Sequence, residues 1–223
     1  MDKRLQSVAA RVRPGRRLAD IGTDHAYLPV WLVQQGVCPC AVATDLRRGP
    51  AEHARQTVAA AGLADRIDVR VGDGLAPLRP GEADDIVLAG MGGDTIAAIL
   101  AAASWIRDPA LHLVLQPQSR AEKTRAFLLE NGFSLLREET VLSAGRRYLI
   151  IQAAYTGAAP DPRAWKPYVG ILDPAAERPW LEKQARLCDV RQKGLLAAGD
   201  PVAAEEAAAL AAAIRQYIRG EIA

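Results

Sequence analysis

Residues 18–29 read Leu18-Ala19-Asp20-Ile21-Gly22-Thr23-Asp24-His25-Ala26-Tyr27-Leu28-Pro29, an apolar segment that runs through one glycine into helix-compatible sequence. The apolar residues up to Ile21 predict a buried strand, and Gly22 allows a tight turn that a β-carbon would hinder. Helix-compatible sequence continues to Gln35, and Gly36 predicts its end. Such a strand–turn–helix unit places amide groups and a helix N-terminus at the edge of a parallel sheet, where open α/β folds bind ligands.

The glycine content of this turn restricts the kind of ligand. A dinucleotide fingerprint needs three glycines in Gly-x-Gly-x-x-Gly, whereas only Gly22 stands here. Asp20, Gly22 and the polar turn that follows favour a ligand without a pyrophosphate. The alternative is an ordinary turn between a strand and a helix of an α/β protein.

The composition is that of a globular protein, with half of the 223 residues apolar and 24% charged. This length accommodates one α/β domain of ordinary size and a small appendage. No apolar run approaches the ~20 residues of a membrane span, and the N-terminal segment has no apolar signal core. Three cysteines without zinc-site spacing favour the reducing cytoplasm. Three separated histidines without a Cys/His cluster predict no metal site.

Strand-like and helix-like segments alternate after the first unit, as in a parallel sheet with crossover helices. The next four strands are predicted at residues 40–45, 66–71, 85–90 and 112–117. Pro50 is predicted to begin one helix, and a Ser-x-x-Glu capping box at Ser119 and Glu122 is predicted to begin another.

Residues 135–142 and 147–155 predict two closing strands, and their short connection at 143–145 makes them an antiparallel hairpin. Five β/α units followed by such a hairpin are the outline of an α/β fold of the class I, Rossmann-like methyltransferase type. That fold has a seven-stranded, mostly parallel sheet. A Rossmann dehydrogenase would not require the closing hairpin.

A stretch rich in small residues and proline, 156–162, is predicted to link a domain of residues 1–156 to a C-terminal domain of residues 161–223. The C-terminal domain holds two helix-compatible segments, with Gly199 as the stop of the first and Asp200 as the cap of the second. Apolar residues recur every three or four positions in both, which predicts a helical hairpin.

Polar and glycine signals fall at the carboxyl ends of four consecutive predicted strands, which share one crevice in an open parallel sheet. They are Asp20 and Gly22, then Asp45, then Asp73 and Gly74, then Gly90 and Met91. A carboxylate after the second strand can accept hydrogen bonds from both ribose hydroxyls, and one after the third can accept from an adenine amino group. The set fits S-adenosylmethionine as cofactor. The alternative for Met91 is a residue that only fills the core.

Five motifs lie in one order along residues 3–155: Asp20 to Pro29, Gly72-Asp73-Gly74, Ala89-Gly90-Met91-Gly92-Gly93, Leu115-Gln116-Pro117 and Asn131-Gly132-Phe133. Together they resemble the bacterial tRNA (adenine-22-N1)-methyltransferases, the TrmK family. The resemblance implies methyl transfer from S-adenosylmethionine to N1 of adenosine 22 in the tRNA body. The C-terminal region resembles the coiled-coil-like domain of that family in pattern only.

N1 of adenine carries an in-plane lone pair, so catalysis can rest mainly on aligning N1 with the methyl group. N1 lies on the Watson–Crick edge, so the base must be unpaired or extruded. Asp24, His25 and Tyr27 are the polar and aromatic catalytic candidates. Further candidates for the pocket of the base are Pro29, Gly92, Gly93, Gln116 and Pro117.

Each catalytic candidate has a purely structural alternative. Asp24 can simply cap the helix that begins near Ala26. His25 can be a structural histidine at the helix start, and Tyr27 can form part of the pocket wall.

Basic residues are concentrated in two segments that are predicted to contact RNA phosphates. Residues 1–17 predict an amphipathic helix with a basic outer face, and the first helix of residues 161–223 is locally basic. The proposed contacts are Lys3, Arg4, Arg11, Lys183 and Arg186. The alternative for both segments is a solvated surface.

Three functions are compatible with these patterns. The first is a cytoplasmic, monomeric tRNA adenine-N1 methyltransferase. The second is a methyltransferase for a small molecule or a protein. The third is a catalytically silent S-adenosylmethionine-binding module that interacts with RNA.

Overall fold

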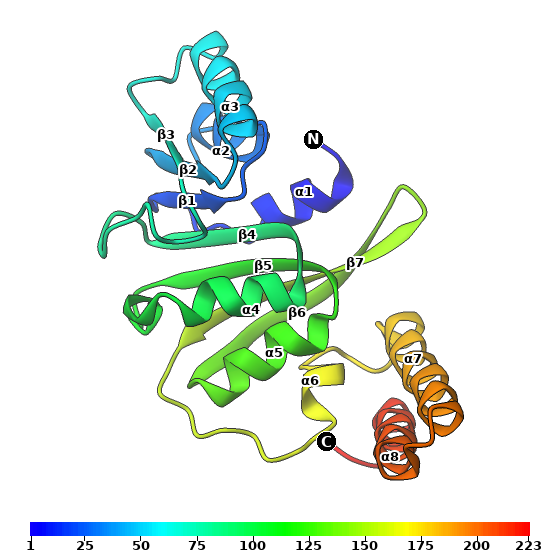
Figure 1. The fold of residues 1–223 in the computed structure, drawn as a ribbon. Helices are drawn as coiled ribbons and strands as arrows, with labels where there is room; N and C mark the ends of the chain where they lie inside the picture. Colours follow the sequence, from blue (N-terminus) through cyan, green and yellow to red (C-terminus); the bar gives the residue numbers. More distant parts are fainter.

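The computed structural model describes residues 1–223 and contains a seven-stranded sheet with the order β3-β2-β1-β4-β5-β7-β6 (Figure 1). The strands are β1 (Leu18–Ile21), β2 (Ala41–Asp45), β3 (Ile67–Val71), β4 (Asp85–Gly92), β5 (His112–Ser119), β6 (Phe133–Ser143) and β7 (Arg146–Tyr155). Neighbouring strands are parallel, except that β7 runs antiparallel to both β5 and β6. The predicted methyltransferase-type sheet is therefore confirmed.

Helices cover both faces of this sheet. One face packs against α1 (Lys3–Ala9), α2 (Tyr27–Gln34) and α3 (Arg48–Ala60), and the other against α4 (Gly93–Ala101) and α5 (Ala121–Glu130). The central strands are buried on both sides, because successive side chains point to opposite faces. Leu18 belongs to the core between the sheet and α1–α3, and its neighbours Ala19 and Ile21 belong to the core on the α4–α5 side. This burial on both faces explains the continuous apolar run in the sequence.

The turn of the β6–β7 hairpin consists of Ala144 and Gly145, both with positive φ (47° and 75°). Two such residues match the right-handed twist of the flanking strands. The hairpin is confirmed, and its strands are longer than the sequence pattern indicates.

The C-terminal segment forms α6 (Lys166–Val169), α7 (Arg178–Ala197) and α8 (Pro201–Ile218). The Asp200 side chain accepts a hydrogen bond from Ala203 N (3.0 Å), so the predicted cap is present. α7 and α8 lie against each other as a hairpin (Figure 1). Their buried face, with Leu181 and Ile214, is continuous with the core on the α4–α5 side of the sheet.

A buried ion pair also ties this segment to the sheet. Arg125 of α5 binds Glu138 of β6 (2.7 Å), and both side chains are at most 1% exposed. Arg125 also donates to the backbone oxygens of Pro167 and Tyr168, and Glu138 accepts from the Ile171 amide. The pair is therefore closed by residues from the C-terminal third of the chain.

Three predicted helix starts or lengths are wrong. No capping box forms at Ser119 and Glu122, because Ser119 is still paired in the sheet and Arg120, with φ of 51°, occupies the cap position. The helix expected over residues 1–17 covers only Lys3–Ala9. The helix assigned to Pro50 begins two residues earlier, at Arg48.

Candidate functional site

A cavity of about 360 Å³ lies at the carboxyl ends of β1 and β4, bounded by α1 and by the turn before α2. This is the crevice where open α/β sheets bind ligands. Its wall includes Arg4, Asp20, Gly22, Asp24, Gly90 and Gln118.

The turn after β1 is shaped by Gly22, which has a φ of 72°. The positive φ favours glycine here, and a β-carbon would lie 2.2 Å from Cε of Met91, so the end of that flexible side chain would have to move. The amides of Gly22 and Thr23 both donate to the Thr44 oxygen at 2.8 Å, which fixes the turn against β2. Met91 therefore contacts the turn and is more than a filler of the distant core.

Asp20 is an enclosed carboxylate beside the cavity. Its pKa is raised to about 6, mainly by burial and to a smaller extent by the nearby Asp45 carboxylate, while a hydrogen bond from the Thr23 hydroxyl (2.6 Å) opposes the rise. A carboxylate kept in such surroundings is typical of a binding site, where a ligand of opposite charge can compensate it.

Asp45 connects the turns that follow β1 and β2. Its two oxygens accept hydrogen bonds from the Asp24 amide (3.3 Å) and from the Arg47 amide (3.0 Å). An ionised carboxylate has about four acceptor positions, so each oxygen keeps capacity for a ligand hydroxyl.

Asp24 does not cap α2, which removes its structural alternative. The cap position of α2 is Ala26, and no side chain accepts a hydrogen bond from the helix start. Asp24 and Ala26 both have left-handed backbone conformations, with φ of 54° and 56°. The Asp24 side chain is 61% exposed and lies 3.5 Å from Nε2 of His25. A polar side chain is thus presented to solvent by a backbone that non-glycine residues rarely adopt.

Three aromatic rings form a stack beside Asp24. His25 lies between Tyr27 and His53, with ring centroids 5.4 Å apart in both pairs and interplanar angles of 18° and 8°. Tyr27 is 57% exposed, although its apolar neighbours in α2 are buried. His53 comes from α3, and no sequence signal connected it with the site.

The opposite wall is formed by α1 and the end of β5. Nη1 of Arg4 donates to Oε1 of the fully buried Gln116 (2.8 Å), and Nε2 of Gln116 has no hydrogen-bond partner. Gln118 borders the cavity two residues later, on the same side of the strand. The alternation of Gln116 and Gln118 at a strand end is the sequence signal that could have identified Gln118.

Other predicted site residues lie outside this cavity. Asp73 and Gly74 line a separate cavity with α4, and Pro29 is buried within α2. A β-carbon on Gly93 would lie 2.0 Å from the Arg120 carbonyl oxygen, so this glycine permits close packing of α4 on the β5–α5 junction. Gly92 and Pro117 lie at the same junction, and Pro117 lines a third cleft.

The predicted phosphate contacts have different environments. Lys3 and Lys183 are exposed, and neither forms an ion pair. Arg11 makes two hydrogen bonds to Glu139, and Arg186 lies 3.9 Å from Glu182. Much of the N-terminal basic charge is therefore already matched by carboxylates of the same chain.

Two further features concern metal ions and membranes. No group of three or more His, Cys, Asp or Glu side chains is arranged to hold a metal ion. No helix combines the length and the apolar character that crossing a membrane requires.

Comparison with known proteins adds a family to this geometry. A family described as "Methyltransferase domain" matches residues 1–151. The chain is 39% identical over 163 residues to the tRNA (adenine(22)-N(1))-methyltransferase of Bacillus subtilis (strain 168), covering 72% of this chain and 68% of that protein.

Two solved structures are similar to this chain over more than nine-tenths of its length. The m1A22 tRNA methyltransferase TrmK of B. subtilis is 32% identical with a TM-score of 0.78, over 99% of this chain and 97% of that one. Sp1610 of Streptococcus pneumoniae in complex with S-adenosyl-L-methionine is 31% identical with a TM-score of 0.76, over 92% and 98% of the two chains.

Proposed function

Because the chain belongs to the family of tRNA (adenine(22)-N1)-methyltransferases, we propose that it transfers a methyl group from S-adenosylmethionine to N1 of adenosine 22 in tRNA. The observation that carries this proposal is the convergence of Asp20, Asp24 and Asp45 around the Gly22 turn, at the edge of the cavity.

The residues present fit the proposed cofactor. The enclosed Asp20 carboxylate lacks a positively charged partner, and the Gly22 turn brings backbone without a β-carbon to the edge of the cavity. Asp20 and the backbone at Gly22 and Gly90 would hold the methionine portion, and Asp45 the ribose hydroxyls. Asp73 would accept from the adenine amino group at the far end. When bound, S-adenosylmethionine supplies a methyl group on a positively charged sulfur.

The proposed reaction depends on the alignment of adenine N1 with the methyl group more than on the removal of a proton. The N1 lone pair of the substrate forms the new N–CH₃ bond, while the S–CH₃ bond breaks and its electron pair stays on sulfur. Positive charge develops on the adenine ring as this happens. Asp24 is proposed to accept a hydrogen bond from the exocyclic amine and to stabilise that charge, a type of contribution that preorganised groups supply efficiently.

The aromatic stack is proposed to receive the base outside its helix. N1 is inaccessible in a paired base, so the nucleotide must be unpaired or extruded. Tyr27 presents an exposed ring at one end of the stack, supported by His25 behind it, and stacking on this ring partly compensates for the lost base stacking. Gln118 provides an amide group on the opposite wall, and the buried Gln116 positions Arg4 of that wall through its hydrogen bond.

The proposal is tested by methyl transfer to tRNA transcripts. The purified protein is incubated with labelled S-adenosylmethionine and either a transcript with adenosine at position 22 or the same transcript with guanosine there. We expect 1-methyladenosine only in the first, measured by mass spectrometry of the nucleosides. Methylation of both transcripts, or of neither, would contradict the proposed position. Transfer to small molecules or proteins, or cofactor binding without any transfer, would support the other functions that the sequence permits.

We also propose that the protein works as a cytoplasmic monomer, where tRNA is available to it.

A further inference from the structure

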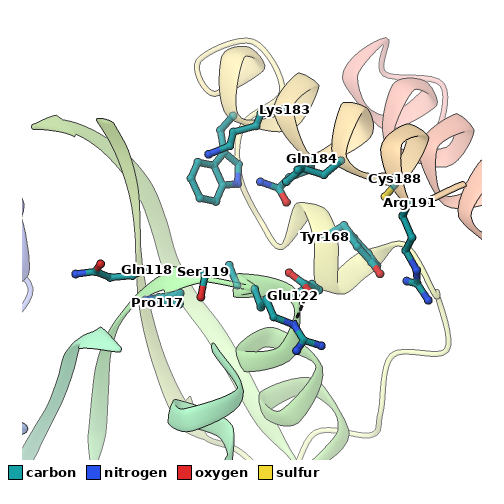
Figure 2. A pocket seen from close by; sticks show the side chains of 13 residues that line it. Pro117, Gln118, Ser119, Glu122, Tyr168, Lys183, Gln184, Cys188 and Arg191 are labelled. Atoms are coloured by element: carbon teal, nitrogen blue, oxygen red, sulfur yellow. Dashed lines mark ion pairs between the residues drawn. The ribbon is translucent and has the colours of Figure 1, made fainter. Parts of the chain in front are cut away.

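The cleft lined by Pro117, of about 350 Å³, separates the β5–α5 junction from the C-terminal helices. Pro117, Gln118, Ser119 and Glu122 form one side, and side chains of α6 and α7 face them across the gap (Figure 2). Both regions of the protein are therefore needed to form this cleft.

The cleft contains positive charge that the protein itself does not neutralise. Lys183 and Arg191 of α7 have no carboxylate within 4.0 Å, whereas Arg178 and Arg186 of the same helix lie 3.8 and 3.9 Å from Glu182. Glu122 is the one carboxylate in the lining, and it lies 3.9 Å from Arg120, which also binds Asp94 (2.8 Å). The cleft thus has an excess of cations over carboxylates.

Unsatisfied hydrogen-bond donors add to this charge. α5 begins at the cleft, and no side chain caps its N-terminus. The indole Nε1 of Trp180, a lining residue that is 7% exposed, has no hydrogen-bond partner. A helix N-terminus, unpaired cations and a free N–H donor together favour an anion with several acceptor oxygens.

The ring of Trp180 argues against a base-stacking site. Its faces are almost fully covered, and Nζ of Lys183 lies 5.7 Å from the ring centroid. The ligand is thus better matched by a phosphate than by a nucleobase.

Gln118 connects this cleft with the cavity described above, because it lines both. The shared residue gives an RNA strand with its base in the cavity a route past Gln118 towards Lys183. We propose that the cleft binds a backbone phosphate of the tRNA close to the target adenosine. This inference rests on the proposed function, and it makes the C-terminal helices part of the device that positions the substrate.

A pair of matched double variants tests the proposal. Lys183→Gln with Arg191→Gln removes the two unpaired cations of the cleft, and Lys193→Gln with Arg178→Gln removes the same charges from α7 outside it. Affinity for an unmodified tRNA transcript is measured by fluorescence anisotropy at several salt concentrations. Melting temperature and S-adenosylmethionine affinity are measured alongside.

We expect the cleft variant to lose about 10- to 100-fold in tRNA affinity, because hydrogen bonds to charged groups are lost. Its plot of log K against log salt should flatten by about 1 unit, because the counterions of one phosphate contact are no longer released. The control variant should change far less, and cofactor affinity should stay constant in both. Equal losses in the two variants, or none in the cleft variant, would overturn the inference. Whether the parent protein methylates position 22 is a separate result, so failure of the proposed function is distinguishable.

Discussion

The ionised form of the Asp20 carboxyl group is disfavoured by its burial. Its pKa is raised to about 6 mainly by burial, so the folded protein holds this proton more tightly than the unfolded chain does. The group therefore favours folding most at low pH, and this advantage is lost as the pH rises from about 4 to about 6. Above that range the ionised carboxylate costs about 3 kcal/mol of stability, because one pKa unit corresponds to about 1.4 kcal/mol.

Asp20→Asn should separate stability from function. Asn keeps an acceptor for the Thr23 hydroxyl but carries no charge, so the variant should unfold with a higher free energy than the parent at pH 8. The difference should shrink towards pH 4, where the parent is protonated. Denaturant unfolding at several pH values measures this, and calorimetry should show weaker S-adenosylmethionine binding. A variant that is no more stable at pH 8 would contradict the assigned cost of the buried charge.

Asp24→Asn should lower the rate of the chemical step without loosening the fold. Asn tolerates the left-handed backbone as well as Asp does, but it lacks the charge that we propose to stabilise the methylated ring. We expect a loss of at least ~10²-fold in single-turnover methylation, the lower range for a lost acid–base contribution. Tyr27→Phe, which keeps the ring and removes the hydroxyl, should lose less. Parent-like rates for Asp24→Asn would leave Asp24 without a chemical role.

The sequence could predict Asp20, Gly22 and Asp45 at this site because strand ends are readable from local pattern. It could not predict that Ala26 caps α2 with a left-handed backbone, since alanine has no local preference for that conformation. His53 was also invisible, because the α3 helix brings it to His25 from 28 positions away along the chain. Contacts of this kind exist only once the fold has formed.

The helices and strands agree with the prediction from sequence where a single interaction determines the local structure. Apolar runs predicted the inner parallel strands, because these strands are buried on both faces, and the alternation of Ile67, Val69 and Val71 predicted the edge strand β3. The start of α5 was mispredicted because two forces compete for Ser119. Pairing with Gly92 extends β5 through that residue, so its hydroxyl is not available as a cap. Such competition is decided by the neighbouring strand and not by the local motif.

Asp45→Ala should affect two connections between elements together. The side chain holds the turn before α2 and the turn before α3 through the amides of Asp24 and Arg47. Its removal should lower the melting temperature and weaken S-adenosylmethionine binding by about 10- to 100-fold, as expected for a lost charged hydrogen-bond acceptor. Asp45→Asn, which retains one acceptor oxygen, should lie between parent and Asp45→Ala in both measurements. Unchanged cofactor affinity in a folded Asp45→Ala protein would refute the ribose assignment.

At the scale of the whole molecule, the domain boundary near residue 160 is clear in the sequence pattern, but the hydrophobic core continues across it. Leu181 and Ile214 share one buried cluster with the sheet, and the Arg125–Glu138 pair is closed by the backbone of α6. The linker composition predicted the boundary, but it carries no information on which surfaces meet afterwards. Residues 161–223 thus complete the surface of the α4–α5 layer.

Breaking the buried pair should therefore destabilise the entire chain. Arg125→Met leaves Glu138 enclosed without its partner, and we expect a loss of about 3–5 kcal/mol in the free energy of unfolding. Arg125→Met combined with Glu138→Leu removes both charges and should recover much of that loss. Denaturant unfolding should follow one transition in fluorescence and in circular dichroism for the parent. Two separate transitions, or a silent Arg125→Met, would show that the C-terminal helices are not coupled to the sheet.

The Arg125–Glu138 pair also gives the chain an order of assembly during translation. Both residues are synthesised before Pro167 and Tyr168, whose carbonyl groups close the pair, and before the helices that cover it. Translation adds roughly 5–20 residues per second, so the 63 residues from Thr156 to Ile218 take about 3–13 s to make. Until these residues are made, the charged side chains of Arg125 and Glu138 remain in contact with water on a face of the sheet that is buried in the folded protein. The α4–α5 layer is therefore completed only after the C-terminal helices α6, α7 and α8 have been synthesised.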